Sequence, residues 1–497
     1  MYSAMKNSKE QIHSVKYNFL MNFILTASNF IFPLLTFPYV SRILHATGNG
    51  KVNFAASVAN YFLMVASLGI PTYGVRACAK VRDDQDKLSR TAQEILIINF
   101  IATVFVTITY LICVNTIPRF SQDKTLFLIE GINIVLNMFG ANWLYQALEQ
   151  YDYITVRSIF FKAISVVLMF LLVHQESDYR IYAATTVFAA VGSNVMNFIR
   201  LRKYISFKKI GRYNFKQHLK PIFVLFAQSA TISIYTNLDT VMLGFMKGDV
   251  DVGFYTAAVK VKNVLLSVVA SLGNVMLPRM TYYVNKRERG EFNKLLLLAL
   301  NAEVFMAFPL VAFFSFEAKD CTLFLAGEGY LGSVAAMQII NFAIIPNGLT
   351  GVIGTQALTS LNREHQVLYS VIVGAISDFI LNLLMIPLWG ATGAALATMI
   401  AEYLVLLTQL FLAKDVVGEA FKKIRFGRYG AITIFALIPT IIVSYFPVNN
   451  SFLRLVITAI VFFGVYALGL YIKKDEIFYG LLDNKISGKL IHRTGKN

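Results

Sequence analysis

The feature that most constrains the fold of this chain is a series of apolar stretches, each long enough to cross a lipid bilayer. A hydrocarbon layer of about 30 Å requires about 20 apolar residues per helix. The 497-residue sequence holds fourteen stretches of this kind. They cover residues 17–40, 52–75, 93–115, 125–147, 154–174, 180–200, 221–246, 252–277, 295–316, 332–357, 366–388, 391–413, 429–446 and 452–472. These stretches predict an all-α integral membrane protein.

The amino-acid composition agrees with this class. Hydrophobic residues make up 56% and charged residues 15% of the chain, whereas a soluble domain has about 25% charged residues. The three cysteines show no CxxC spacing, and the six histidines form no metal-binding motif. We therefore expect no disulfide framework, no metal site and no cofactor.

The positions of lysine and arginine predict the topology, because basic residues are retained preferentially in cytoplasmic loops. If both termini are cytoplasmic, 35 of the 45 basic residues lie in inner segments and 8 in outer loops. The remaining two, Lys260 and Lys262, lie inside the eighth stretch. The net charge of +17 therefore marks the cytoplasmic face, and we expect no nucleic-acid partner. The polar residues 1–16 are too long for the n-region of a signal peptide, so the first stretch is expected to remain as a membrane helix.

An internal repeat relates two halves of the chain. Four pairs carry it: Val65–Gly69 with Val269–Gly273, Gly50 with Gly253, Arg76 with Arg279, and Gln146–Leu148 with Gln356–Leu358, at offsets of 204, 203, 203 and 210 positions. Paired halves of this size are typical of transporters in which two bundles move about a central site. Because each half holds six stretches, both halves are predicted to have the same orientation in the membrane.

The repeat and the charge pattern together predict the domain organisation. The expected parts are a cytoplasmic N-terminus (1–16), a first lobe (17–200), a basic cytoplasmic linker (201–220), a second lobe (221–413), a loop with two further helices (414–472) and a basic cytoplasmic tail (473–497). Arg76 and Arg279 then lie at the inner face, where we expect them to anchor lipid headgroups. The last two helices either line a groove for a lipid chain or serve as a scaffold.

Several motifs resemble those of Wzx-type polysaccharide flippases, which belong to the multidrug/oligosaccharidyl-lipid/polysaccharide (MOP) exporter superfamily. The similar segments are Phe37–Leu44 followed by Gly50, Trp143–Glu149, Leu238–Gly244, Val252–Ala258 and Leu277–Arg279. The sequence departs from the family at His45–Ala46, where the family usually places a glycine after the leucine. That departure affects how tight the turn at this position can be.

The resemblance implies a MATE-like fold of two parallel six-helix lobes plus two C-terminal helices. It also implies a flippase that moves undecaprenyl-diphosphate-linked oligosaccharide across the bacterial plasma membrane by alternating access, for the biosynthesis of capsule, O-antigen or exopolysaccharide. The implied partners are the lipid-linked oligosaccharide, the phospholipid bilayer and the polysaccharide polymerase or assembly proteins.

A cavity that passes a diphosphate should contain cations, and charged residues at membrane depth generally face the interior of the bundle. Lys260 and Lys262 lie roughly 12–15 Å along their helix and diverge by about 200° around it, so they cannot both face one cavity. One is expected to contact the diphosphate or glycan, and the other to pair with a carboxylate such as Asp239; a purely structural ion pair is the alternative. Lys162, which could also snorkel to the cytoplasmic interface, and Arg42, which could lock the lobes by a salt bridge, complete the candidate cationic site.

The candidate coupling or polar cavity residues are acidic or amide side chains within the stretches. Asp378 and Asn382 are four residues apart and share one helix face, while Glu402 and Glu303 lie on neighbouring helices. Together with Asp239 they could exchange a proton or bind a cation, which would couple transport to a Na⁺ or H⁺ gradient. Hydrogen-bonded packing carboxylates are the alternative.

Three other functions are compatible with parts of the sequence. A flippase for the peptidoglycan precursor would share the fold and the lipid diphosphate. A cation-coupled multidrug exporter would prefer an acidic cavity, which the deep lysines disfavour. A membrane glycan polymerase is disfavoured by the duplicated lobes and by the absence of a large outer loop, so we do not expect an enzyme.

Overall fold

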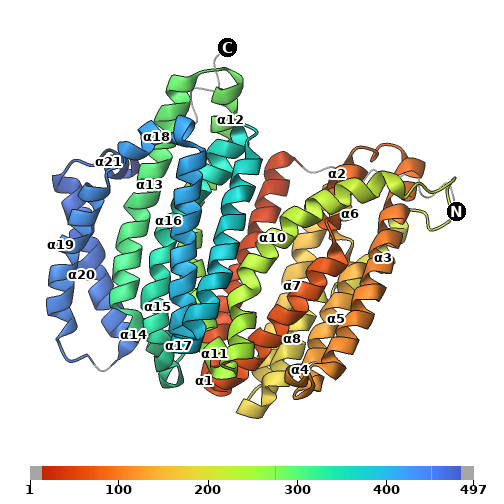
Figure 1. The fold of residues 1–497 in the computed structure, drawn as a ribbon, viewed down its shortest axis with the longest axis horizontal. Helices are drawn as coiled ribbons and strands as arrows, with labels where there is room; N and C mark the ends of the chain where they lie inside the picture. The colour runs from red at the N-terminus through yellow and green to blue at the C-terminus, as the bar shows by residue number, and fades with distance from the viewer. Residues whose placement is uncertain (1–13, 275, 449, 483–497) are drawn as a thin grey trace. The chain divides into compact units, whose positions relative to one another are not determined.

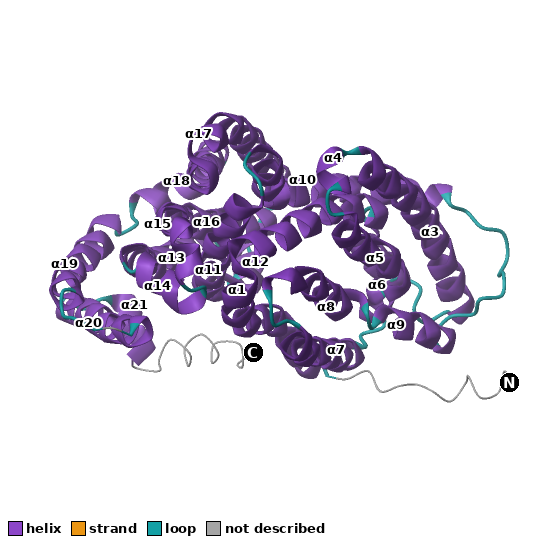
Figure 2. Ribbon diagram, turned by 90° about the horizontal axis from the view of Figure 1, so that it is seen from below, coloured by secondary structure: helices purple, strands orange, loops and turns teal. Residues whose placement is uncertain are grey.

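The structure is a computed structural model that describes residues 14–274, 276–448 and 450–482. Within these ranges the secondary structure is helical and contains no strand (Figure 2). The chain divides into two compact units, Met1–Thr256 and Ala257–Asn497. The predicted all-α membrane architecture is thereby confirmed.

In the first unit, long helices run side by side (Figure 1). Its elements are α1 (Val15–Ser67), α2 (Ile70–Ala79), α3 (Gln85–Thr116), α4 (Pro118–Ser121), α5 (Lys124–Gly140), α6 (Asn142–Ala147), α7 (Tyr151–Leu172), η2 (Glu176–Asp178), α8 (Tyr179–Val191), α9 (Asn194–Arg200), η3 (Leu201–Lys203), α10 (Lys216–Met246) and the start of α11 (Asp249–Asn274). Helix α1 packs against α3, α5, α7 and α10, and α5 lies between α3 and α8.

The second unit is organised around α13 and α17. Its further elements are α12 (Leu277–Asn285), α13 (Arg289–Phe316), α14 (Ala318–Leu325), η4 (Glu328–Ser333), α15 (Val334–Ile340), η5 (Asn341–Ala343), α16 (Ile344–Thr350), the π-helix η6 (Gly351–Leu358), α17 (Glu364–Leu412), α18 (Lys414–Lys422), α19 (Phe426–Ser444), α20 (Ser451–Ile472) and α21 (Glu476–Leu482). Helices α19 and α20 pack against each other and against α13 and α14.

Eleven helices of the described ranges are long and apolar enough to cross a membrane, so the predicted count of fourteen is not confirmed. The difference has two physical causes. The helical segments Leu20–Ala79 and Glu364–Leu412 each cover two of the predicted stretches. The predicted stretch 180–200 is interrupted by a turn between α8 and α9, so neither piece reaches the length of a span.

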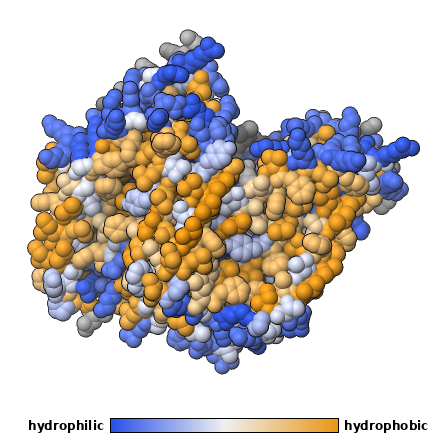
Figure 3. Space-filling model, viewed as in Figure 1, coloured by the Kyte–Doolittle hydropathy of each residue, from blue (hydrophilic) through white to orange (hydrophobic). Residues whose placement is uncertain are grey.

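Large apolar side chains cover the outside of the long helices in each unit. Phe105 on α3 and Phe411 on α17 are 70% and 72% exposed. Figure 3 shows an apolar belt on this face, with hydrophilic residues above and below it. Exposed apolar surface of this extent is costly in water and favourable in lipid. The chain is a multi-pass membrane protein.

The boundary between the compact units differs from the predicted linker. Helix α10 packs against α1 and α2 and belongs to the first compact unit, which ends at Thr256 inside α11. The predicted lobes rest on the sequence repeat rather than on packing, so a second lobe beginning at residue 221 stays a prediction.

The two merged helices each bend at one residue. Inside α1, His45 has φ 52° and ψ −173°, and inside α17, Gly390 has φ 52° and ψ −128°. Glycine adopts such angles at little cost, whereas other residues are strained in this region. His45 occupies the position at which the family that this chain resembles places glycine. The departure from the family pattern therefore puts a residue other than glycine into strained backbone angles.

Replacing His45 by glycine is expected to stabilise the protein by about 1–2 kcal/mol, because the substitution removes the backbone strain. Thermal unfolding of the purified protein measures the change. Asn60, which is exposed in the regular part of α1, provides the control: Asn60→Gly should destabilise by about 0.5–1 kcal/mol. A lower unfolding temperature for His45→Gly would contradict the interpretation.

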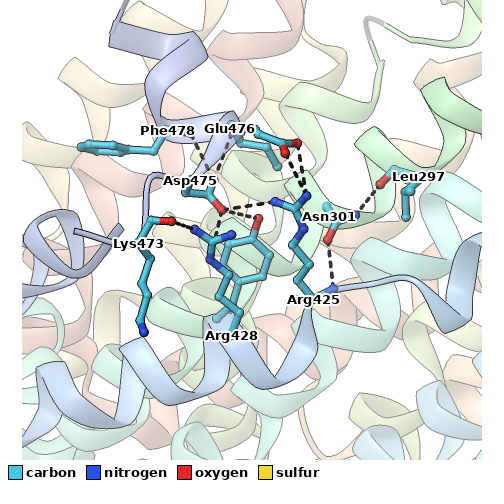
Figure 4. A network of polar contacts seen from close by, with 10 residues as sticks. Leu297, Asn301, Arg425, Arg428, Lys473, Asp475, Glu476 and Phe478 are labelled. Atoms are coloured by element: carbon cyan, nitrogen blue, oxygen red, sulfur yellow. Dashed lines mark hydrogen bonds and ion pairs between the residues drawn. The ribbon is translucent and has the colours of Figure 1, made fainter. Parts of the chain in front are cut away.

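A polar network fastens α19 and α20 to α13 (Figure 4). The buried Asp475, between α20 and α21, accepts a hydrogen bond from the Tyr429 hydroxyl at 3.2 Å. The guanidinium groups of Arg428 and Arg425 lie 3.6 and 3.9 Å from the same carboxylate oxygen. On α13, Asn301 Oδ1 accepts the backbone N–H of Arg425 at 3.0 Å. The buried carboxylate of Asp475 thus connects the ends of α19, α20 and α21.

Two further contacts attach α20 to α13 and α14 at other positions along its length. The Tyr466 hydroxyl donates to the carbonyl oxygen of Phe305 on α13 at 2.8 Å. Arg454, at the other end of α20, forms an ion pair with Asp320 on α14 at 3.3 Å. Burial raises the pKa of Glu317, which lies beside this ion pair. The last two spans are therefore fixed to the unit along the whole length of α20.

Candidate functional site

Two predicted cationic residues lie in the first unit. Lys162 on α7 donates hydrogen bonds to Ser28 Oγ at 2.8 Å and to Asn29 Oδ1, both on α1. Arg42 is exposed on α1, and its guanidinium donates to the carbonyl oxygen of Pro38 at 2.6 Å. Lys162 therefore joins two helices, and a role of either residue in substrate binding stays a prediction.

The other two predicted cations, Lys260 and Lys262, lie on the part of α11 that belongs to the second unit. Both side chains are half-buried. They are two positions apart in a regular helix and so point about 200° apart. Asp239, the carboxylate suggested as a partner, is buried on α10 in the first unit and accepts a hydrogen bond from the Tyr255 hydroxyl.

The predicted coupling residues lie in the interior of the second unit. Asp378 and Asn382 are completely buried on one face of α17, and Glu402 is buried in the other half of the same helix. Glu303 is buried on α13, where a Cβ atom added at Gly348 would lie 2.7 Å from its Oε2. The structure thus brings Asp378 and Asn382 together as expected, and their role in coupling stays a prediction.

The repeat-related glycines Gly50 and Gly253 meet in the first unit. A Cβ atom at Gly50 would overlap the carbonyl oxygen of Asp249, and one at Gly253 would overlap that of Ala46. Only the lack of side chains lets the backbones of α1 and α11 approach this closely. These residues lie at the end of the first unit opposite to the basic segment 200–220, and we call their contact the glycine contact.

Side chains next to the glycine contact reinforce it. Arg119 on α4 forms an ion pair with Asp249 and donates to the carbonyl oxygen of Gly244 at 3.1 Å. Phe54 packs over Gly244, and its ring lies 5.4 Å from that of Phe245. The start of α11 and the end of α10 are thereby held to α1 and α4.

At the basic end of the first unit, the linker is attached to α3. The amide group of Gln93 donates to the carbonyl oxygens of Ser206 and Lys208, and the Tyr213 hydroxyl donates to Gln93 Oε1 at 2.8 Å. Ser89 Oγ accepts the backbone N–H of Ser206 at 3.0 Å. The predicted linker is therefore a docked segment of the first unit.

Glu94 forms the centre of this docking region. Its carboxylate is completely buried and accepts hydrogen bonds from the backbone N–H of Asn214, from Gln217 and from Arg90 at 2.8, 2.9 and 3.1 Å. It also contacts Nε2 of the buried His218 at 2.5 Å. Four partners compensate for the burial of this charge.

His218 continues the chain of hydrogen bonds to α2. Its Nδ1 lies 2.7 Å from the Tyr73 hydroxyl. An ionised carboxylate can only accept hydrogen bonds, so Nε2 of His218 donates to Glu94. Helices α2, α3 and α10 are thus connected by one buried chain of polar groups.

A family motif contributes at the same end. Glu149, the last residue of the segment Trp143–Glu149, accepts a hydrogen bond from Arg82 at 2.6 Å. This hydrogen bond raises the pKa of Arg82, which lies in the turn between α2 and α3. The motif residue therefore has a structural role in holding that turn.

Comparison with known proteins extends these observations. Residues 15–284 match the family described as "Polysaccharide biosynthesis protein". A relative from Escherichia coli (strain K12), named "Putative O-antigen transporter", is 23% identical over 407 residues, which cover 81% of this chain and 97% of the relative. A relative of the same name from Shigella dysenteriae is also 23% identical and is covered completely.

Two solved structures share the fold. The lipid II flippase MurJ in an inward closed conformation superposes with a TM-score of 0.75 at 16% identity, over 94% of this chain and 99% of MurJ. An inward-facing multidrug resistance MATE family transporter of the MOP superfamily gives a TM-score of 0.58 at 12% identity, over 78% of this chain and 98% of the transporter.

The chain therefore shares its fold with a transporter of the MOP superfamily and with a lipid flippase. The glycine contact and the charged residues inside the spans are compatible with that class. More specifically, the chain belongs to the polysaccharide biosynthesis protein family, which matches more than half of its length. The resemblance noted in the sequence is confirmed.

Proposed function

We propose that this protein is a flippase that moves undecaprenyl-diphosphate-linked oligosaccharide units from the inner to the outer face of a bacterial plasma membrane. The observation that carries the proposal is the family match over residues 15–284, together with O-antigen transporter relatives that align along most of the chain. The product would serve capsule, O-antigen or exopolysaccharide biosynthesis, alongside polymerase or assembly proteins.

The proposed orientation places both termini and the basic segment 200–220 in the cytoplasm. This orientation follows from the excess of lysine and arginine at that end. The glycine contact then lies at the outer end and would hold that end closed while substrate enters from inside. In this proposal the contact separates later in the transport cycle.

An ion gradient is the proposed energy source. Asp378, Glu402 and Glu303 are buried acidic groups in the second unit, and such groups can bind a proton or a cation when access changes. Collapsing the proton gradient and the sodium gradient separately, with selective ionophores, is the direct test. The ionophore that stops transport in vesicles identifies the coupling ion.

The peptidoglycan precursor is the second candidate substrate, because the fold similarity to the lipid II flippase is extensive. A multidrug exporter is the third, through the MATE transporters. These two rest on fold alone, whereas the polysaccharide assignment also has the sequence family.

Deletion of the gene in its host, followed by complementation, tests the three candidates. Loss of surface polysaccharide, with lipid-linked oligosaccharide accumulating on the inner face, supports the proposal. Lysis on depletion would instead indicate the peptidoglycan precursor, and drug sensitivity with normal polysaccharide would indicate drug export. Translocation of a fluorescent lipid-linked oligosaccharide by the purified protein in vesicles provides the biochemical check.

A further inference from the structure

A cavity of about 620 Å³ opens between α2, α3 and α10 at the basic end of the first unit. Its size falls within the range of about 300–1,000 Å³ that is typical of small-molecule sites. All its lining residues belong to the first unit. We call this cavity the basic pocket.

Three cations line the basic pocket. Arg76 comes from α2, Lys80 directly follows that helix, and Lys220 comes from the first turns of α10. No acidic side chain is among the lining residues, and no described carboxylate forms an ion pair with any of the three. A cavity with three cations and no acid attracts anions, and phosphate groups above all.

One wall of the pocket is fixed by the buried polar chain described above. Tyr73, Gln217 and His218 line the cavity. Gln217 and His218 are hydrogen-bonded to Glu94 directly, and Tyr73 is connected to it through His218. The Glu94 carboxylate itself lies behind this wall, completely buried and surrounded by donors. Its negative charge is therefore compensated locally, and the cavity keeps its cationic character.

Other lining residues of the pocket are apolar, and one of them is also largely exposed on α10. Ala77, Pro221 and Leu225 line the cavity together with Val224, which is 63% exposed. The neighbouring Phe223 on α10 is 55% exposed. In a membrane protein such a surface contacts lipid chains, so a ligand of the pocket can extend an apolar chain along α10.

We propose that the basic pocket binds the phosphate-bearing headgroup of a membrane lipid, with the phosphate against Arg76, Lys80 and Lys220 and the lipid chain along α10. Two lipids carry this chemistry. One is the transported lipid-linked oligosaccharide, held by its diphosphate before it crosses; that reading rests on the proposed function. The other is an anionic phospholipid.

The test measures equilibrium binding to the purified full-length protein in nanodiscs of neutral lipid. The probes are undecaprenyl diphosphate, phosphatidylglycerol and inorganic pyrophosphate. The triple variant Arg76→Gln, Lys80→Gln, Lys220→Gln is expected to weaken lipid binding about 100-fold, since each cation near a membrane surface contributes roughly fivefold.

Two matched variants separate the pocket from general surface charge. The control triple Arg202→Gln, Lys208→Gln, Arg212→Gln removes the same charge from exposed positions of the same end, outside the pocket. It should weaken binding much less than the pocket triple. The variant Arg76→Lys, Lys80→Arg, Lys220→Arg keeps the charge and should bind nearly as well as the original protein.

Selective loss of undecaprenyl diphosphate binding supports the transported lipid as ligand, and selective loss of phosphatidylglycerol binding supports a phospholipid site. Equal effects of the pocket and control triples would overturn the proposal, as would pyrophosphate binding as tight as that of the lipids. Because binding is measured without translocation, failure of glycan transport by the unaltered protein would refute the proposed function and leave the pocket standing.

Discussion

Replacing Gly50 by alanine is expected to abolish glycan export while the protein still inserts into the membrane. The added Cβ would overlap the carbonyl oxygen of Asp249, so the backbones of α1 and α11 must separate. Overpacking of this kind costs about 3 kcal/mol when backbone must move. That cost would reduce the population in which the glycine contact is formed about 100-fold. Surface polysaccharide, quantified against the protein level in the membrane, measures the effect.

Gly464 on α20 is the matched control, because a Cβ added there meets no atom within 4 Å. Gly464→Ala should leave export unchanged and stabilise the helix slightly, by up to about 1 kcal/mol. Lys51, half-buried near the glycine contact, offers a direct readout. A cysteine at position 51 should react faster with a thiol reagent when Gly50 is replaced. Normal export and unchanged labelling in Gly50→Ala would show that the outer end closes elsewhere.

The double variant Lys260→Ala, Lys262→Ala is expected to lose surface glycan with normal protein abundance. If one of these half-buried lysines contacts the diphosphate, removing that charged hydrogen bond costs about 1.5–3 kcal/mol, or roughly 10- to 150-fold in binding. The two side chains point in different directions, so one single variant should reproduce most of the loss.

Lys247 and Lys319 provide the control for this pair, since both are exposed at the ends of their helices. Their double replacement by alanine should leave export intact. Arginine at positions 260 and 262 should restore part of the activity, because it keeps the charge. Full export by the double alanine variant would exclude a cationic site on α11.

Much of the architecture could be predicted from the sequence, because the length of an apolar stretch alone determines whether a helix can cross the bilayer. The bends could not. His45 and Gly390 lie in the intervals 41–51 and 389–390 between predicted spans, but the sequence does not show that the helix continues through each interval with a single bend. The break after Val191 falls at the short polar turn signal Gly192–Asn194, which the prediction of one stretch over 180–200 passed over.

The candidate site was only partly accessible to such reasoning. The repeat correctly drew attention to Gly50 and Gly253, because a close approach of two helices restricts both positions to glycine. Glu94 and His218 were missed, since they are 124 positions apart and join only through folding. Their only sequence signals were a carboxylate near the start of a span and a histidine just before another.

The polar network around Asp475 has a mechanical consequence. The pair α19–α20 is fastened to the second unit near both of its ends, at Asn301 and at Arg454, and again between them at Tyr466. A pair of helices attached at three positions along its length cannot rotate independently of the remainder of its unit. Any rotation of the second unit in the bilayer would therefore carry α19 and α20 along as part of the same rigid body. The lipid next to these two helices would be displaced by that rotation.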